Sequence, residues 1–162
     1  MEVRVLQGHP FDQASDMVVL PVTKGKTLFS GLTTPFRKLL DEDLVAHAEG
    51  RGFEGGLGDV LILPTYGTAK AKFVAFLGAG ERGSITTDTY RRLGALCVKK
   101  ARELKLKNVA TTWSALPSSS LSAREAGAAF AEGARLAAYG FHAYHKRNAD
   151  RHAKTKLKTL TV

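Results

Sequence analysis

An uninterrupted apolar run after Asp16 constrains the fold of this chain more than any other feature. It spans residues 17–22, Met-Val-Val-Leu-Pro-Val, and residues 73–77, Phe-Val-Ala-Phe-Leu, form a second run of this kind. A strand with one face in water alternates polar and apolar residues, whereas a continuous run is typical of a strand buried on both faces. The two runs therefore predict a sheet that other elements cover on both sides.

Strand-like and helix-like segments alternate along the rest of the chain. Further strands are expected at residues 2–5, 60–63, 108–113 and 160–162. Amphipathic helices are expected at residues 35–48, from about 87 to 104, and from 123 to 141. This order predicts an α/β fold: a three-layer α/β/α domain over residues 1–162, with a mixed, mainly parallel sheet and helices on both faces.

Local signals define the ends of the expected helices. Gly50 is placed to end the first helix in the left-handed conformation. Thr86 or Thr87 is the expected cap of the second, and Ser122 with Glu125 has the spacing of a capping box for the third. The third helix is expected to bury one side, made of Ala126, Ala129, Phe130, Gly133, Leu136, Ala137 and Phe141.

The positive charge of the chain, +9 overall, is concentrated in its C-terminal half. Residues 1–80 carry 8 Lys and Arg against 9 Asp and Glu, and residues 81–162 carry 16 against 6. Residues 145–158 form a basic segment with Lys146, Arg147, Arg151, Lys154, Lys156 and Lys158. Such a strip can contact the phosphates of a nucleic acid without reading its sequence, or serve as a solvated linker or interdomain contact.

Four stretches resemble the N-terminal domain of the leucyl aminopeptidase (cytosol aminopeptidase) family. They are residues 16–22, residues 53–64 (similar to the family's F-x-G-K-x-G-E loop and strand), residues 73–80 (similar to V-x-L-V-G-L-G) and residues 132–146 (similar to E-G-x-x-L-A-x-Y-x-F-x-x-Y-K). The last is the most specific of the four. Gly56 and Asp59 depart from the pattern, since the family often has Lys and Glu there.

The resemblance implies a macrodomain-like fold. In such aminopeptidases this domain precedes a catalytic domain with two metal ions, zinc or manganese, and contributes to assembly of a homo-oligomer and, in some members, to DNA binding. The catalytic domain has no counterpart in residues 1–162. The resemblance therefore implies no catalytic residue, metal or cofactor in this chain, and the catalytic domain of the same polypeptide or family as its partner.

One glycine-rich turn is a candidate ligand site. Gly78, Gly80 and Arg82 follow the apolar strand at residues 73–77 and should lie at the carboxyl edge of the sheet, where α/β folds bind ligands. Macrodomains bind ADP-ribose with glycine-rich loops at this edge. Glu81 would repel a pyrophosphate, so an ordinary turn between strand and helix is the alternative.

Other motifs have a structural interpretation. The Ala48-Glu49-Gly50-Arg51 motif echoes a metallopeptidase sequence but lacks the carboxylates that two metals need. Glycines at 52–58 lead from a helix into a strand, which favours turns over a phosphate loop. His142 and His145 have helical spacing, yet few other ligands are near in sequence, so they more simply extend the basic surface. Cys97, the one cysteine, is expected to be inert in the core.

The sequence thus predicts a non-catalytic N-terminal domain of a two-metal aminopeptidase, with a role in assembly, positioning or regulation. A binder of ADP-ribose or a related nucleotide and a basic nucleic-acid-binding module are the alternatives. The lone cysteine, the lack of a signal-like segment and the lack of a long apolar run predict a cytoplasmic protein without a membrane partner.

Overall fold

The computed structural model describes residues 1–25, 48, 50–67, 69–112, 116, 121–139 and 157–162. Within these residues, six strands form one sheet: β1 (Glu2–Arg4), β2 (Met17–Val22), β3 (Val60–Pro64), β4 (Phe73–Gly78), β5 (Asn108–Thr111) and β6 (Thr159–Thr161). The described helices are α3 (Thr87–Glu103), α4 (Ala123–Ala138) and the short 3-10 helices η1 (Pro10–Asp12) and η2 (Arg82–Ser84). The expected alternation of strands and helices is confirmed.

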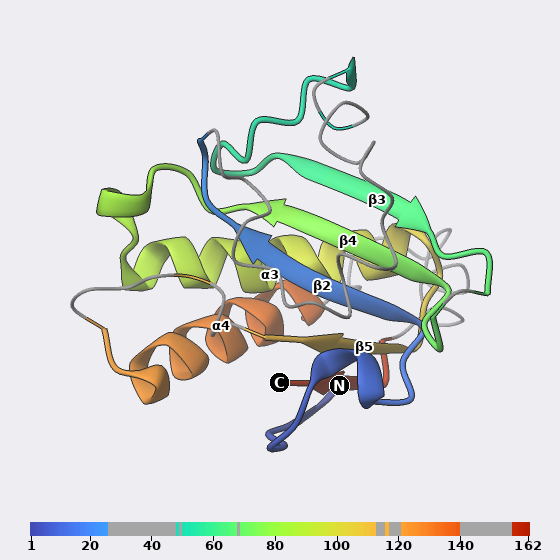
Figure 1. The fold of residues 1–162 in the computed structure, drawn as a ribbon. Coiled ribbons are helices and arrows are strands. Elements are labelled where there is room, and N and C mark those ends of the chain that lie inside the picture. The colour runs from blue at the N-terminus through green and yellow to red at the C-terminus, as the bar shows by residue number, and fades with distance from the viewer. Residues whose placement is uncertain (26–47, 49, 68, 113–115, 117–120, 140–156) are drawn as a thin grey trace, which may run out of the picture.

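The sheet is mixed and mainly parallel, as predicted. Its strand order is β1-β6-β5-β2-β4-β3, and β3 alone runs antiparallel to its neighbour (Figure 1). Between β3 and β4 the chain turns at Tyr66 and Gly67, which have positive φ angles of 48° and 86°. All six residues of β2 are buried, because this strand lies inside the sheet and is covered on both faces.

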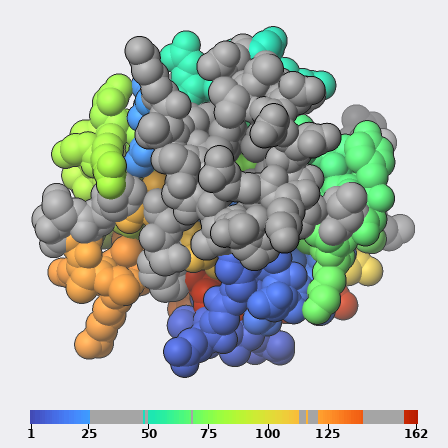
Figure 2. All heavy atoms as spheres, in the orientation of Figure 1, coloured from blue at the N-terminus to red at the C-terminus, as the bar shows by residue number. Residues whose placement is uncertain are grey.

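The two ends of the chain lie side by side at one edge of the sheet. β1 pairs in parallel with β6, so that Val3 lies beside Leu160. The amide of Leu6 also donates to the carbonyl of Val162 at 2.9 Å. Figure 2 shows N-terminal atoms in blue next to C-terminal atoms in red at this end of the molecule. The predicted strand-like C-terminus is therefore part of the sheet.

Helices α3 and α4 cover one face of the sheet, behind it in Figure 1. Their buried side chains share one core cluster with alternate sheet residues, among them Met17, Val19 and Leu77. Thr86 caps α3 in a capping box with Thr89, and Ser122 and Glu125 form the predicted capping box of α4. The Ser122 hydroxyl and amide hydrogen bonds lower the pKa of the Glu125 carboxyl.

The two helices approach each other closely at a pair of glycines. A Cβ atom on Gly94 would overlap the carbonyl oxygen of Phe130, and one on Gly133 would overlap the carbonyl oxygen of Arg91. Backbone therefore meets backbone at this crossing. The side chain of Arg91 spans the same contact and donates from Nε to Glu132 at 2.7 Å.

Two apolar residues of the predicted elements prove to be in solvent. Leu136 is 67% exposed and Ala134 is buried instead, one turn after the buried Phe130 and directly after Gly133, where α4 meets the backbone of α3. Val5 is 74% exposed because β1 ends at Arg4.

The second face of the sheet has its own core cluster. It includes Val18, Leu20 and Phe76 from the sheet, together with Phe53, whose ring centre lies 6.5 Å from that of Phe76. Ala48 also belongs to this cluster. The helix predicted over residues 35–48 lies outside the described residues except for its last position.

The end of that segment corrects the prediction for Gly50. The residue in the left-handed conformation is Gly52, with φ 69°, and the amide of Phe53 donates to the carbonyl of Ala48 at 2.9 Å. This six-to-one bond and a left-handed glycine just before its donor are the features of a Schellman motif. The left-handed glycine that ends this helix is therefore Gly52, directly before the buried Phe53, and not Gly50, two residues earlier.

Cys97 lies fully buried on the sheet-facing side of α3. Burial disfavours the thiolate and raises the pKa of its thiol to about 12. Because the thiolate is the reactive form, we expect no reaction of the native protein with a disulfide reagent at pH 8, and reaction of one thiol per chain in denaturant. The reaction is followed by the absorbance of the thiolate that the reagent releases. Rapid labelling of Cys97 without denaturant would contradict this burial.

Candidate functional site

The two glycine-rich stretches singled out in the sequence bind each other. The amide of Gly58 donates to the carbonyl of Gly78 at 3.2 Å, the amide of Gly78 to Asp59 at 2.9 Å, and the amide of Gly80 to Gly55 at 3.0 Å. We call residues 55–59 and 78–80 the glycine clasp. It joins the loop before β3 to the end of β4, beside the antiparallel ladder of these strands.

The glycine clasp requires glycine in conformation and in space. Gly55, Gly58 and Gly80 have positive φ angles of 80°, 99° and 83°. A Cβ atom on Gly78 would overlap the carbonyl oxygen of Gly56 and lie 2.7 Å from the carbonyl carbon of Gly55. The loop is thus a turn held by intrachain bonds, in agreement with the turn interpretation of residues 52–58.

Asp59 closes the turn of the clasp. Its carboxylate accepts from the amide of Gly56 at 2.8 Å, and its own amide donates to the carbonyl of Gly56 at 3.0 Å. A Cβ atom on Gly56 would lie 3.1 Å from the Asp59 carboxylate. The two positions that depart from the family pattern are therefore in direct contact with each other.

The structure places Gly78 and Gly80 in the clasp, with their amides already in use, and Arg82 two residues beyond it. Besides the bonds of Gly78 and Gly80, the amide of Ala79 donates to Val22 at 2.7 Å, and the carbonyl of Gly80 accepts from the amide of Lys24 at 2.8 Å. Arg82 is an exposed residue in η2, and Glu81 before it is exposed as well. A phosphate would have to replace these amide bonds, and ligand binding at Gly78, Gly80 and Arg82 stays a prediction.

Most of the predicted basic segment lies outside the described residues. This holds for Lys146, Arg147, Arg151, Lys154 and Lys156, and also for His142, His145 and Glu49. Lys158 is described: it is exposed just before β6, and its amide donates to the carbonyl of Lys107 at 2.7 Å. Contact with nucleic acid or with another domain stays a prediction.

The described residues do not fit a metal centre. Among them, no three His, Cys, Asp or Glu side chains converge as a metal site requires. We derive no metal-dependent step from this chain. In the same part of the chain, no helix combines the length and hydropathy of a membrane span.

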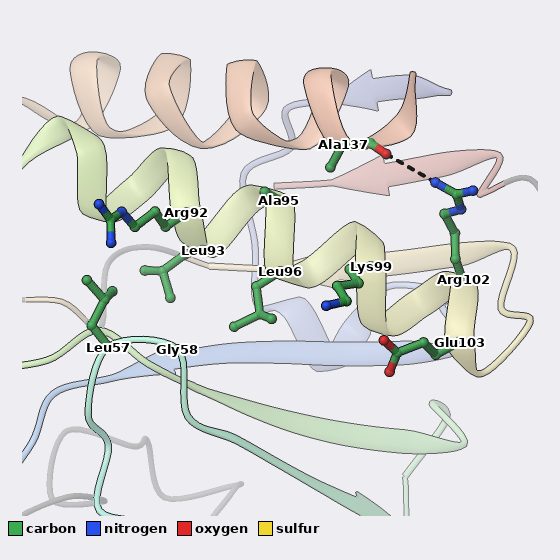
Figure 3. Close-up of a pocket in the computed structure, with 10 residues that line it drawn as sticks. All are labelled: Leu57, Gly58, Arg92, Leu93, Ala95, Leu96, Lys99, Arg102, Glu103 and Ala137. Atoms are coloured by element: carbon green, nitrogen blue, oxygen red, sulfur yellow. Dashed lines mark hydrogen bonds between the residues drawn. The ribbon is translucent and has the colours of Figure 1, made fainter. Parts of the chain in front are cut away.

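A groove of about 690 Å³ follows the flank of α3 (Figure 3). Its apolar lining comes from three elements: Leu57 of the clasp, Leu93, Ala95 and Leu96 of α3, and Ala137 of α4. Figure 3 shows Leu57 reaching up from the loop toward α3, with Leu96 directed toward the sheet. The sequence analysis did not reveal this groove, which Leu96 borders as a half-buried side chain at the margin of the core.

Four charged side chains of α3 line the same groove: Arg92, Lys99, Arg102 and Glu103. Arg92 donates to Asp88 at 2.7 Å, Arg102 donates to the carbonyl of Ala137 at 3.2 Å, and Glu103 accepts from Lys100 at 2.7 Å. Within the described part of the chain, the Lys99 ammonium has no carboxylate within ion-pair distance. The helical spacing of residues 92, 96, 99 and 103 is the sequence signal that could have revealed this stripe.

Comparison with known sequences gives a consistent match. Residues 19–148 match the model of the cytosol aminopeptidase family, N-terminal domain. A probable cytosol aminopeptidase of Alkaliphilus oremlandii (strain OhILAs) is 28% identical over 160 residues, which cover 99% of this chain and 32% of that protein. The chain therefore spans about a third of the length of this relative.

Comparison with solved structures supports the fold. A mutant of tomato leucine aminopeptidase superposes with a TM-score of 0.78 at 18% identity, over 99% of this chain and 32% of that one. The macrodomain of Mycobacterium tuberculosis DarG superposes with a TM-score of 0.66 at 13% identity, over 99% of this chain and 96% of that one. The α/β fold is macrodomain-like, as the sequence predicted.

Proposed function

Because the chain belongs to the cytosol aminopeptidase family, matching its N-terminal domain, we propose that it is the non-catalytic domain that positions and assembles a two-metal aminopeptidase domain. The match to the N-terminal model over residues 19–148 is the observation that carries the proposal. The relatives' additional length, about two thirds of each protein, is where the catalytic domain would lie. The proposal includes a cytoplasmic location, in keeping with the name of this relative, a probable cytosol aminopeptidase, and a homo-oligomer, which only the family resemblance implies.

The hydrogen bonds of the glycine clasp support a structural role for its loop residues. The amides and carbonyls of the clasp form hydrogen bonds with each other and with β2. These bonds hold the loop before β3 against the end of β4. A rigid edge of this kind suits a domain that holds another one in place. Binding of nucleic acid by residues 146–158 remains a separate prediction, which a steep decrease of DNA retention with salt would support.

We expect the purified chain to show no turnover of leucine 4-nitroanilide with added Mn²⁺ or Zn²⁺. A two-metal hydrolase needs several carboxylates that converge on both ions, and the described residues offer no such cluster. Release of nitroaniline is measured by absorbance, with a complete family enzyme as positive control. Turnover that follows the chain through successive chromatographic columns would overturn the non-catalytic role.

A domain exchange tests the positioning role separately. The matching N-terminal third of the Alkaliphilus oremlandii relative is removed in one version and replaced by this chain in another. We expect the exchange to preserve oligomer mass in light scattering and anilide turnover, and the deletion to lose both. A deletion version that assembles and turns over like the exchanged one would exclude a positioning role.

The macrodomain-like fold makes ADP-ribose the natural alternative ligand, and we expect no saturable heat on calorimetric titration. The amides of Gly78 and Gly80 already donate to Asp59 and Gly55, and Glu81 adds negative charge beside them. A macrodomain with proven ADP-ribose binding serves as positive control. Saturable binding that a Gly80→Val substitution abolishes would establish this alternative.

A further inference from the structure

The groove along α3 has the size and composition of a small-molecule site. Ligand pockets commonly measure roughly 300–1,000 Å³ and combine an apolar lining with a few polar groups, and this groove measures about 690 Å³. Its apolar side chains come from three elements: Leu57 from the clasp, Leu96 from α3 and Ala137 from α4 (Figure 3). Packing of these elements therefore forms the groove before any ligand arrives.

The charges of the groove favour an anion. Three of its four charged side chains are cationic, and Glu103 is occupied by Lys100. Arg92 and Arg102 already have partners in Asp88 and the Ala137 carbonyl. Lys99 is exposed and lacks a carboxylate partner among the described residues, so it is the cation that is free to bind one.

We propose that this groove binds a small anionic amphiphile: an apolar body with one carboxylate at its end. The apolar body lies against Leu57 and Leu96, and the carboxylate binds the ammonium of Lys99. A charge-assisted bond at the rim leaves the carboxylate partly hydrated, so that binding costs little desolvation while the apolar body leaves water. A cationic amphiphile would face Arg92, Lys99 and Arg102 and is excluded by repulsion.

The glycine clasp forms the wall of the groove that lies opposite α3. Gly58 lines the groove next to Leu57, and its amide is fixed to the carbonyl of Gly78. Leu57 is a large apolar side chain, yet it is 45% exposed. It lies close to Gly80, because a Cβ atom placed on Gly80 would be 3.4 Å from the Cβ of Leu57. The groove therefore has a fixed apolar wall opposite the helix.

The test uses the full chain and three decyl compounds that differ only in their head group: decanoate, decanol and decylamine. Calorimetry below the micelle-forming concentration measures affinity, and amide chemical shifts locate the ligand. We expect decanoate to bind at least tenfold more tightly than decylamine, with shifts confined to residues 57–58, 92–103 and 137. Decanol should fall between the two, because it has the apolar body without the charge.

Two pairs of variants separate the groove from the general positive charge of the protein. Lys99→Glu should weaken decanoate binding at least tenfold, whereas Arg124→Glu, the same charge change outside the lining, should leave it within twofold. Leu96→Asp should abolish binding, whereas Leu136→Asp, on an exposed leucine outside the lining, should not. Thermal melts confirm that each variant is folded.

Three results would overturn the proposal. One is decanoate binding that Lys99→Glu and Arg124→Glu weaken equally, since this would mean attraction by net charge alone. Another is equal affinity for decanoate and decylamine. The third is the absence of decanoate binding together with self-association that Leu96→Asp abolishes, which would assign the groove to a second copy of the chain.

Discussion

Replacement of Gly133 by valine is expected to lower the melting temperature of the domain by about 6–12 °C. The added Cβ would overlap the carbonyl oxygen of Arg91 and lie 2.7 Å from its Cα, and these backbone atoms of α3 cannot rotate away as a side chain can. Overpacking of a close contact costs about 1–3 kcal/mol, and a backbone obstacle belongs at the upper end of that range. In a domain of this size, about 1 kcal/mol corresponds to about 2–4 °C.

Circular dichroism melts and urea midpoints measure this effect. The matched control is Gly50→Val, because Gly50 also has helical backbone and a Cβ there meets nothing within 4 Å. We expect the control to change stability by less than about 1 kcal/mol. If Gly133→Val melts at the temperature of the unchanged protein, α3 and α4 do not touch backbone to backbone.

Replacement of Gly78 by valine is expected to open the glycine clasp and to destabilise the protein by about 2 kcal/mol. The side chain would occupy the position of the Gly56 carbonyl, so the loop must leave the end of β4. The bonds from Gly58 to Gly78 and from Gly80 to Gly55 would break with it. Hydrogen exchange should therefore accelerate at Gly58 and Gly80 more than in α3 and α4.

Gly83→Val is the control for this variant, since a Cβ on Gly83 meets nothing within 4 Å and its φ is ordinary. Its melting curve and its amide exchange should match those of the unchanged protein. Exchange that accelerates uniformly over the whole sheet in Gly78→Val would show global rather than local unfolding. Unchanged exchange at Gly58 would show that the clasp tolerates a side chain.

The sequence was informative wherever structure is determined locally. The apolar run at residues 17–22 predicts a strand buried on both faces, because no other environment accommodates six consecutive apolar side chains in a strand. The capping box at Ser122 forms within four residues and follows from side-chain chemistry alone, whereas for α3 the same chemistry left Thr86 and Thr87 as possible caps, and the structure selects Thr86. Strand pairing of β3 with β4 follows from their short separation along the chain.

Features that depend on distant partners were beyond local reasoning. Glycines at 55–58 predict turns, but the sequence does not specify that their hydrogen-bond partners lie at the end of β4, because the backbone amide and carbonyl groups that make these bonds are alike in all residues except proline. Leu136 fits the apolar stripe of α4 as well as Ala134 does, and the packing of α4 against α3, which the sequence does not specify, leaves Leu136 exposed and Ala134 buried. The groove arises in the same way, from three elements that meet only after folding.

The position of β6 has a consequence for how the domain forms during translation. β6 lies between β1 and β5, so β1 acquires its neighbour in the sheet only after residues 159–161 have been synthesised. Until then the nascent chain can join β2, β4, β3 and β5, while residues 2–4 wait unpaired. Pairing of segments that lie far apart along the chain is intrinsically slow. Among the described strands, β1 is therefore the one that waits longest for its neighbour.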